Sequence, residues 1–102
     1  MIKREIAHTD FNGNHAVAVE YFNITQRDYV TLELESNGDL RQHLTQLVDS
    51  KDGVAMMTFF ERLIELSYGI KSDDGKSHEK DSTIFHAFKQ TAAYDALFVE
   101  LL

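Results

Sequence analysis

The residues with the clearest chemical pattern lie in the polar segment 71–81. Gly75, Lys76 and Ser77 match the last three positions of a phosphate-binding P-loop, in which backbone amides wrap a phosphate. That loop also needs a glycine five residues before Gly75, and the sequence has Ile70 there. The same isoleucine takes the first ligand position when Gly75 is aligned with the invariant glycine of a calcium-binding EF-hand loop. We therefore expect a solvated loop that binds neither phosphate nor calcium.

Five histidines raise the question of a metal site. His78 has no second histidine at the spacing that would put two ligands on one face of a helix. At the end of a predicted hairpin, Asp10 lies opposite His15 and His8 lies diagonal to it, so that three potential ligands converge. The alternative is an exposed polar end of a two-stranded ribbon, and we favour that interpretation. We predict no metal and no cofactor.

Residues for catalysis are not evident either. The paired carboxylates Asp73/Asp74 and Glu33/Glu35 lack the apolar surroundings that raise the pKa of a general acid. The chain has no cysteine, which excludes thiol catalysis, disulfides and thiolate zinc sites. Nothing in the spacing positions a serine, a histidine and an aspartate as a triad. We therefore predict that the protein is not an enzyme.

Length and composition indicate a single soluble domain spanning 1–102. The apolar fraction is 43% and the charged fraction 26%, which is ordinary for a globular protein. No apolar run is long enough to cross a membrane, and the N-terminus lacks the apolar region of a signal peptide. The net charge of −7 argues against binding to nucleic acid or to a membrane surface. The absence of cysteine is consistent with a reducing cytoplasm.

The first 22 residues are predicted to form a β-hairpin. Asn12-Gly13 is typical of a type I′ turn, and a two-residue loop of this kind would place Ile6 opposite Val19. The inward face then contains Ile2, Ile6, Val17, Val19 and Tyr21. A lone hairpin is barely stable, so we expect this face to pack on helices.

About four helices are expected over residues 25–102. Thr25, with Asp28 three residues later, is predicted to cap the first helix, over 26–36. Asp39 is predicted to cap the second, which ends near residue 49. The third is expected over 54–68, with Gly69 just past its end. After the polar loop 71–81, one last helix would run to the end of the chain. The expected fold is α+β and mainly α: a hairpin followed by a small helical bundle.

The third and last helices are unusually apolar. Most of the circumference of each is apolar, and the simplest interpretation is that these helices form the core. The alternative is that part of this surface binds a partner, since thioethers and aromatic rings adapt to varied apolar surfaces. On that hypothesis the predicted contact residues are Met56, Met57, Phe59, Phe60, Phe85, Phe88, Phe98 and Leu101, with Leu102 continuing the last stripe.

Several segments together resemble a known family. Residues 10–14 (DFNGN) and 21–25 (YFNIT) are similar to the beginning of siphophage tail assembly chaperones, and residues 66–76 (LSYGIKSDDGK) resemble the next segment of that family. Lys80, Phe88 and Tyr94 match the helix that follows, and 97–101 (LFVEL) matches its end. The similarity covers most of the chain in the right order. The family usually has an aromatic residue where this chain has His78.

The resemblance implies a non-enzymatic role in phage tail assembly. Members of the family are thought to bind the tape measure protein, keep it soluble and bring tail tube protein to it in the host cytoplasm, and they are absent from the mature virion. Two alternatives remain open. One is a small self-assembling phage or bacterial structural adaptor, in which the same apolar surface forms a homo-oligomer. The other is a regulatory protein whose acidic surface binds a basic partner, and its complex would be sensitive to salt.

Overall fold

The computed structural model describes residues 1–101. Its elements, in chain order, are β1 (Ile2–Thr9), β2 (His15–Phe22), α1 (Gln26–Glu35), α2 (Leu40–Ser50), α3 (Gly53–Ser67), β3 (Tyr68–Lys71), β4 (His78–Glu79), α4 (Ser82–Lys89) and α5 (Ala92–Leu101). The predicted α+β fold with its N-terminal hairpin is therefore present. The described part of the chain has five helices rather than about four, and two short strands extend the hairpin into a sheet.

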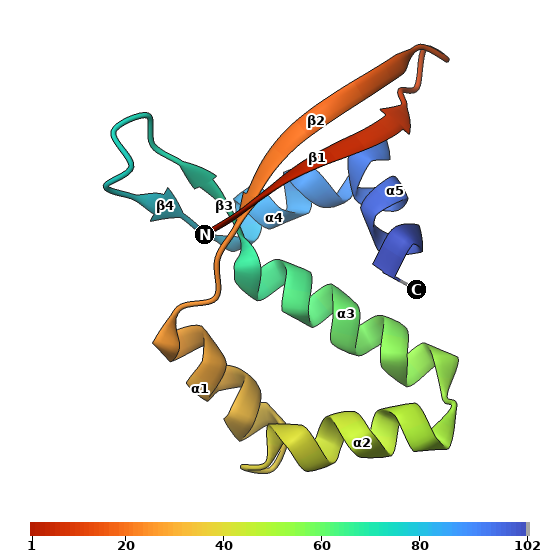
Figure 1. The fold of residues 1–102 in the computed structure, drawn as a ribbon, viewed down its shortest axis with the longest axis vertical. Helices are drawn as coiled ribbons and strands as arrows, with labels where there is room; N and C mark the ends of the chain where they lie inside the picture. Colours follow the sequence, from red (N-terminus) through yellow and green to blue (C-terminus); the bar gives the residue numbers. More distant parts are fainter. Residues whose placement is uncertain (102) are drawn as a thin grey trace.

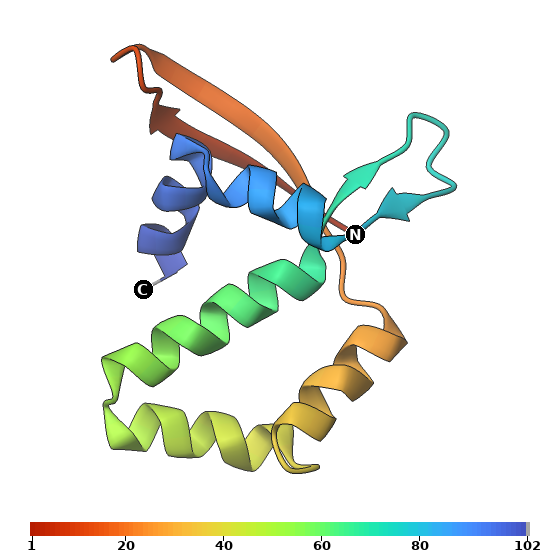
Figure 2. The same ribbon diagram turned by 180° about the vertical axis from the view of Figure 1, so that it is seen from behind.

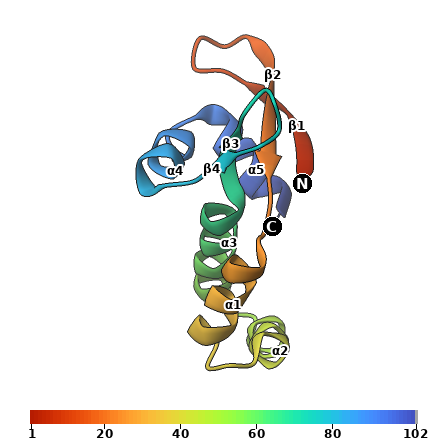
Figure 3. The ribbon, with the colours of Figure 1, turned by 90° about the vertical axis from the view of Figure 1, so that its left-hand side faces the viewer.

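The molecule is elongated, with the sheet and two helices at one end of the long axis and three helices at the other. Figure 1 shows β1 and β2 at the top and α1 and α2 at the bottom, with α3 running between them. Seen from behind, α4 lies in front of the hairpin (Figure 2), and the side view again separates α1 and α2 from the sheet (Figure 3). The radius of gyration is 14.9 Å, against about 13 Å for a compact domain of this length. The helices therefore do not form one tight bundle.

The four strands are antiparallel in the order β1-β2-β3-β4. Ile6 pairs with Ala18, not with Val19, so the predicted hairpin register is wrong by one residue. The cause is the turn: the Asp10 amide donates to the Asn14 carbonyl at 2.9 Å, and Gly13 has a φ of +84°. The hairpin loop is therefore longer than the predicted two-residue turn, and its glycine has a left-handed conformation.

The register decides which side chains enter the core. Successive side chains of a strand point to opposite faces of the sheet. A shift of the pairing by one residue therefore moves the inward-facing side chains of one strand to the outer face. Ile6 and Phe22 are buried, whereas Val17 and Val19, predicted to face inward, are 62% and 45% exposed. Helices cover only the face of the hairpin that carries Ile6.

The predicted starts of the helices are confirmed. The Thr25 hydroxyl accepts from the Asp28 amide, and the Asp28 carboxylate accepts from the Thr25 amide, which completes a capping box at α1. Asp39, Asp52 and Asp81 accept from backbone amides at the starts of α2, α3 and α4. These short-range hydrogen bonds depend only on local sequence.

The last helix was predicted to be continuous, but the structure divides it into two helices. α4 ends at Lys89, and a new helix begins at Ala92. The Thr91 hydroxyl donates to the Phe88 carbonyl at 2.7 Å and accepts from the Tyr94 amide at 3.1 Å. A hydroxyl that caps a helix in this way also competes with continued helical hydrogen bonding, and the chain turns here. Leu102 of the predicted stripe lies outside the described residues.

Gly69 lies just past the end of α3, as predicted, but it does not have the positive φ of a glycine that ends a helix. It lies in β3, with Tyr68 at the end of the helix, and it pairs with Tyr21. A Cβ atom on Gly69 would lie 2.6 Å from the Glu79 carbonyl oxygen and 2.8 Å from the His78 ring. The absence of a side chain therefore lets β4 approach β3, and the predicted polar loop at 71–81 becomes a short hairpin.

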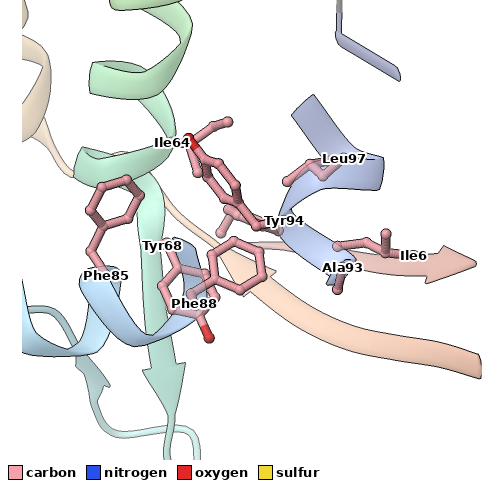
Figure 4. Close-up of a cluster of buried hydrophobic side chains, with 9 residues drawn as sticks. Ile6, Ile64, Tyr68, Phe85, Phe88, Ala93, Tyr94 and Leu97 are labelled. Carbon is pink, nitrogen blue, oxygen red and sulfur yellow. The ribbon is translucent and has the colours of Figure 1, made fainter. Parts of the chain in front are cut away.

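The core lies where the sheet, the end of α3, α4 and α5 meet. Figure 4 shows side chains from all of them converging. The buried cluster consists of Ile6, Phe22, Ile64, Tyr68, Phe85, Phe88, Ala93, Tyr94 and Leu97. α1 and α2 contribute nothing to this cluster, so the core is confined to one end of the molecule.

Candidate partner-binding surface

Helix α3 connects the core with the part of the chain formed by α1, α2 and the turns around them, which we call the arm (25–52). At its C-terminal end α3 inserts Ile64 into the core, with 3% of that residue exposed. On the side that faces the arm, the Phe59 ring lies 5.9 Å from the ring of His43 in α2. The two sides of α3 border two different hollows.

The hollow between α3 and the arm, here called the arm groove, has a volume of about 330 Å³. Its walls are largely apolar and include Leu32, Leu47, Ala55 and Phe59. α2 contributes no fully buried residue, so its apolar stripe is only half covered by α3. The arm groove is therefore an apolar surface that the monomer leaves open.

An ion-pair network lies at the margin of the arm groove. Arg62 Nε is 3.1 Å from both carboxylate oxygens of Glu35, and Arg62 Nη1 is 2.5 Å from Glu65 Oε1. The hydrogen bonds from Arg62 lower the pKa of Glu35 and outweigh the opposite effect of its partial burial. The same contacts raise the pKa of the Arg62 guanidinium. Both groups are therefore charged at neutral pH.

The second hollow lies between the start of β1, the end of α3 and α5, and we call it the apolar groove. One part, about 180 Å³ in volume, is lined mainly by Ile2, Phe22, Leu63, Leu97 and Leu101. It adjoins a part of about 410 Å³ that shares Ile2, Phe22 and Leu63 and extends to Met1 and Ile24. The walls therefore come from both ends of the described chain and from α3.

Two of the polar side chains at the apolar groove, those of Arg4 and Ser67, already have partners. Arg4 forms an ion pair with Glu100 at 2.6 Å, and the Ser67 hydroxyl donates to the Ile64 carbonyl at 3.2 Å. A partner that enters this groove would therefore meet mostly hydrocarbon. Such a surface selects apolar side chains.

The predicted contact residues separate into two groups. Phe85 and Phe88 are buried in the core, and Phe98 packs against it, 5.9 Å from Tyr94 between ring centroids. Leu101 lines the apolar groove and is 41% exposed. The rings of Phe85 and Phe88 cannot be reached from the surface of the folded monomer. Contact of Phe98 and Leu101 with a partner stays a prediction.

The α3 residues of the predicted set are more accessible. Met57 is 47% exposed, Phe59 lines the arm groove, and Met56 and Phe60 are half-buried. The structure therefore distributes the α3 and α5 residues over two grooves and the core, instead of gathering them on one stripe.

Sequence reasoning missed Ile2, Ile24 and Leu63 as surface-groove residues. Ile2 was assigned to the inner face of the hairpin, and it is 63% exposed at the entrance of the apolar groove. Leu63 was seen as one member of an apolar helix stripe. No short-range signal separates these residues from core residues, because the groove is made by three elements far apart in the sequence.

Two of the three candidate metal ligands in the hairpin, Asp10 and His8, form hydrogen bonds within it. Asp10 Oδ1 accepts from the amides of Asn12 and Asn14 at 2.9 Å, and His8 Nδ1 lies 2.9 Å from the Ile6 carbonyl oxygen. Within residues 1–101, no group of three or more metal-ligating side chains is close enough to hold an ion. Over the same residues, no helix has the length and apolarity to cross a membrane.

The small α+β fold, with two open apolar grooves on either side of one helix, is typical of a protein that contacts other polypeptides. The model of one protein family, described as phage tail assembly chaperone, matches residues 1–102. The chain therefore belongs to the phage tail assembly chaperone family. No curated protein and no solved structure is significantly similar to it.

Proposed function

We propose that this tail assembly chaperone binds the tape measure protein of a phage with a non-contractile tail. Binding would keep that long protein soluble and help to recruit tail tube protein during tail assembly. The role is non-enzymatic and belongs to the host cytoplasm, and the chaperone would be absent from the mature virion. The family membership of the whole chain supports the assembly role.

The observation that carries the proposal is the apolar groove. Ile2 and Leu101 line it and are 63% and 41% exposed, while the neighbouring polar side chains of Arg4 and Ser67 are already paired. An amphipathic helix of a partner could place apolar side chains there, in the helix-in-groove mode. Burial of two or three such side chains would contribute roughly 3–9 kcal/mol before association costs. Met57, which is 47% exposed on α3, would extend the contact along that helix.

Co-purification of an untagged tape measure protein with tagged chaperone variants tests this surface. Leu101→Glu places a charge in the apolar groove, and we expect it to reduce the amount of partner retained by about tenfold. Val17→Glu is the matched control, because Val17 is 62% exposed on the uncovered face of the hairpin. Equal retention by both variants, each with an unchanged melting temperature, would contradict the proposal for this groove.

One observation favours a second function, that of a self-assembling adaptor without chaperone activity. The uncovered hairpin face exposes Val17 and Val19, and the arm exposes Leu34 at 73% and Val48 at 65%. Apolar surface of this kind can be covered by further copies of the same chain. A homo-oligomer that does not retain tape measure protein, detected by light scattering after size-exclusion chromatography, would support this alternative.

A further inference from the structure

Lys80 occupies an unusual place in the structure. It lies between β4 and α4, and only 21% of its side chain is exposed. Its ammonium is 2.6 Å from the Asn23 carbonyl oxygen, 2.6 Å from Asp28 Oδ2 and 2.8 Å from the Leu66 carbonyl oxygen. An ammonium has three N–H groups, so each of them has an acceptor.

The three acceptors belong to three different parts of the fold. Asn23 follows β2, Leu66 is in the last turn of α3, and Asp28 is in the first turn of α1. Asp28 is itself fixed by the capping box with Thr25. One side chain thus joins the beginning of the arm to the sheet, to α3 and to the segment that enters α4.

Within the described residues, the arm makes few other buried contacts with the rest of the molecule: Leu32 is 4% exposed, and the His43 ring lies 5.9 Å from that of Phe59. α2 has no buried residue, and α1 buries only Asp28 and Leu32. The other ion pair of the arm, Glu35 with Arg62, has both side chains at least one-third exposed. Exposed pairs of this kind contribute little to stability. Of these two ion pairs, the one between Lys80 and Asp28 is the less exposed.

We propose that Lys80 is a positioning residue that fixes the arm relative to the sheet and α3, and thereby sets the walls of both grooves. Ile24, a wall of the apolar groove, follows directly on Asn23, whose carbonyl binds the ammonium. Leu32, a wall of the arm groove, lies one turn after Asp28. The link to partner binding rests on the proposed function, whereas the positioning of the arm does not.

Hydrogen–deuterium exchange of the full chain tests the positioning. Lys80→Met removes the ammonium, and the double variant Lys80→Met/Asp28→Asn also removes the carboxylate that would otherwise stay buried without its partner. We expect exchange in α1 and α2 to become about tenfold faster in the double variant, while β2, α4 and α5 keep their rates. Lys89→Met is the control, because Lys89 pairs with Glu61 at an exposed site.

The double variant gives two results that would overturn the inference. One is unchanged exchange in α1 and α2. The other is a uniform rise across the arm and the core, because that pattern reports a loss of global stability. If Lys80→Met alone fails to fold, the double variant still decides between these outcomes, since it buries no unpaired charge.

Retention of tape measure protein provides a second readout. We expect the double variant to retain about one-tenth of the partner that the wild type retains, with Lys89→Met at the wild-type level. Full retention despite a loosened arm would overturn the link between the arm and binding. Failure of the wild type to retain the partner would count against the proposed function, and the exchange rates would still decide the role of Lys80.

Discussion

The rings of Tyr68 and Phe88 stack face to face, with centroids 4.0 Å apart and planes at 7° to each other. Tyr68 ends α3, and Phe88 is in the last turn of α4, so the stack joins the two helices beside the sheet. Phe22 packs against both rings, and the Tyr68 hydroxyl donates to Glu20 at 3.0 Å. The stack therefore ties α3 and α4 to β2 in the centre of the core.

This arrangement predicts that Phe88 and Met57 respond differently to truncation. Phe88→Ala removes a ring that is 3% exposed and is expected to lower the free energy of unfolding by about 3–5 kcal/mol. Met57→Ala affects a side chain on an accessible face of α3 and is expected to change it by less than about 0.5 kcal/mol. Urea denaturation followed by circular dichroism measures both values. Similar losses for the two variants would place Met57 in the core as well.

Alkaline pH is expected to destabilise the protein through its buried tyrosines. Burial, with a further effect of Glu61 and Glu65, raises the pKa of Tyr94 from 10 to about 12. Burial and Glu20 raise the pKa of Tyr68 in the same direction. The folded state thus holds these protons more tightly than the unfolded state does. Their contribution to stability is complete below pH 10 and falls as the pH rises from 10 towards 12.

Absorbance of tyrosinate during a pH titration measures this effect. The variants Tyr68→Phe and Tyr94→Phe should each remove one late-titrating group. If both variants leave the late part of the titration unchanged, the raised pKa values belong to other tyrosines.

Acid is expected to weaken the junction between Asp28 and Lys80. Burial alone would raise the pKa of Asp28, but the hydrogen bonds from Lys80 and Thr25 outweigh it and hold the pKa below the ordinary value of 3.8. The stability that this carboxylate provides is therefore complete above pH 3.8 and is lost as the pH falls through the lowered pKa. Between pH 2 and pH 6, the melting temperatures of the wild type and of Asp28→Asn should differ most near pH 6. Parallel curves would contradict a charged pair at this site.

Two glycines provide a matched pair for the close approach of β4 to β3. Gly69→Ala would place a Cβ atom 2.6 Å from a backbone oxygen, and we expect a loss of about 2 kcal/mol. Gly53→Ala meets open space at the start of α3, and we expect it to be neutral or stabilising by about 0.5 kcal/mol. Melting temperatures of the two variants test this difference. Equal melting temperatures would mean that β4 can move away from β3 without a loss of stability.

The parts of the fold that short-range chemistry determines were predictable from the sequence. The capping residues Thr25, Asp39 and Asp81 satisfy free amides within three residues, so the starts of the helices followed from local pattern. The hairpin followed from Gly13, which accepts a positive φ. The register of the hairpin could not be predicted in this way. One extra residue in the turn exchanges the inward and outward faces of a strand, and the Asp10 side chain favours the longer turn by accepting hydrogen bonds from turn amides.

The features that depend on contacts distant in the sequence were not predictable. The break at Thr91 lets Phe88 and Tyr94 meet edge to face, with ring centroids 5.5 Å apart, and both rings pack in a core that also contains Ile6 and Ile64. Before the fold is known, an apolar stripe such as that of α3 is compatible with burial and with exposure. That the α3 residues of the candidate surface bind a partner therefore stays a prediction, and two other members of the set, Phe85 and Phe88, are buried in the core of the folded monomer.

The most direct test of the central claim is co-expression with the tape measure protein encoded in the same phage genome. The soluble fraction of that protein is measured with and without this chain, together with its presence in the purified complex. We expect a several-fold rise in soluble tape measure protein that co-purifies with the chaperone and is reduced by Leu101→Glu. A well-folded chaperone that leaves the tape measure protein insoluble would contradict it.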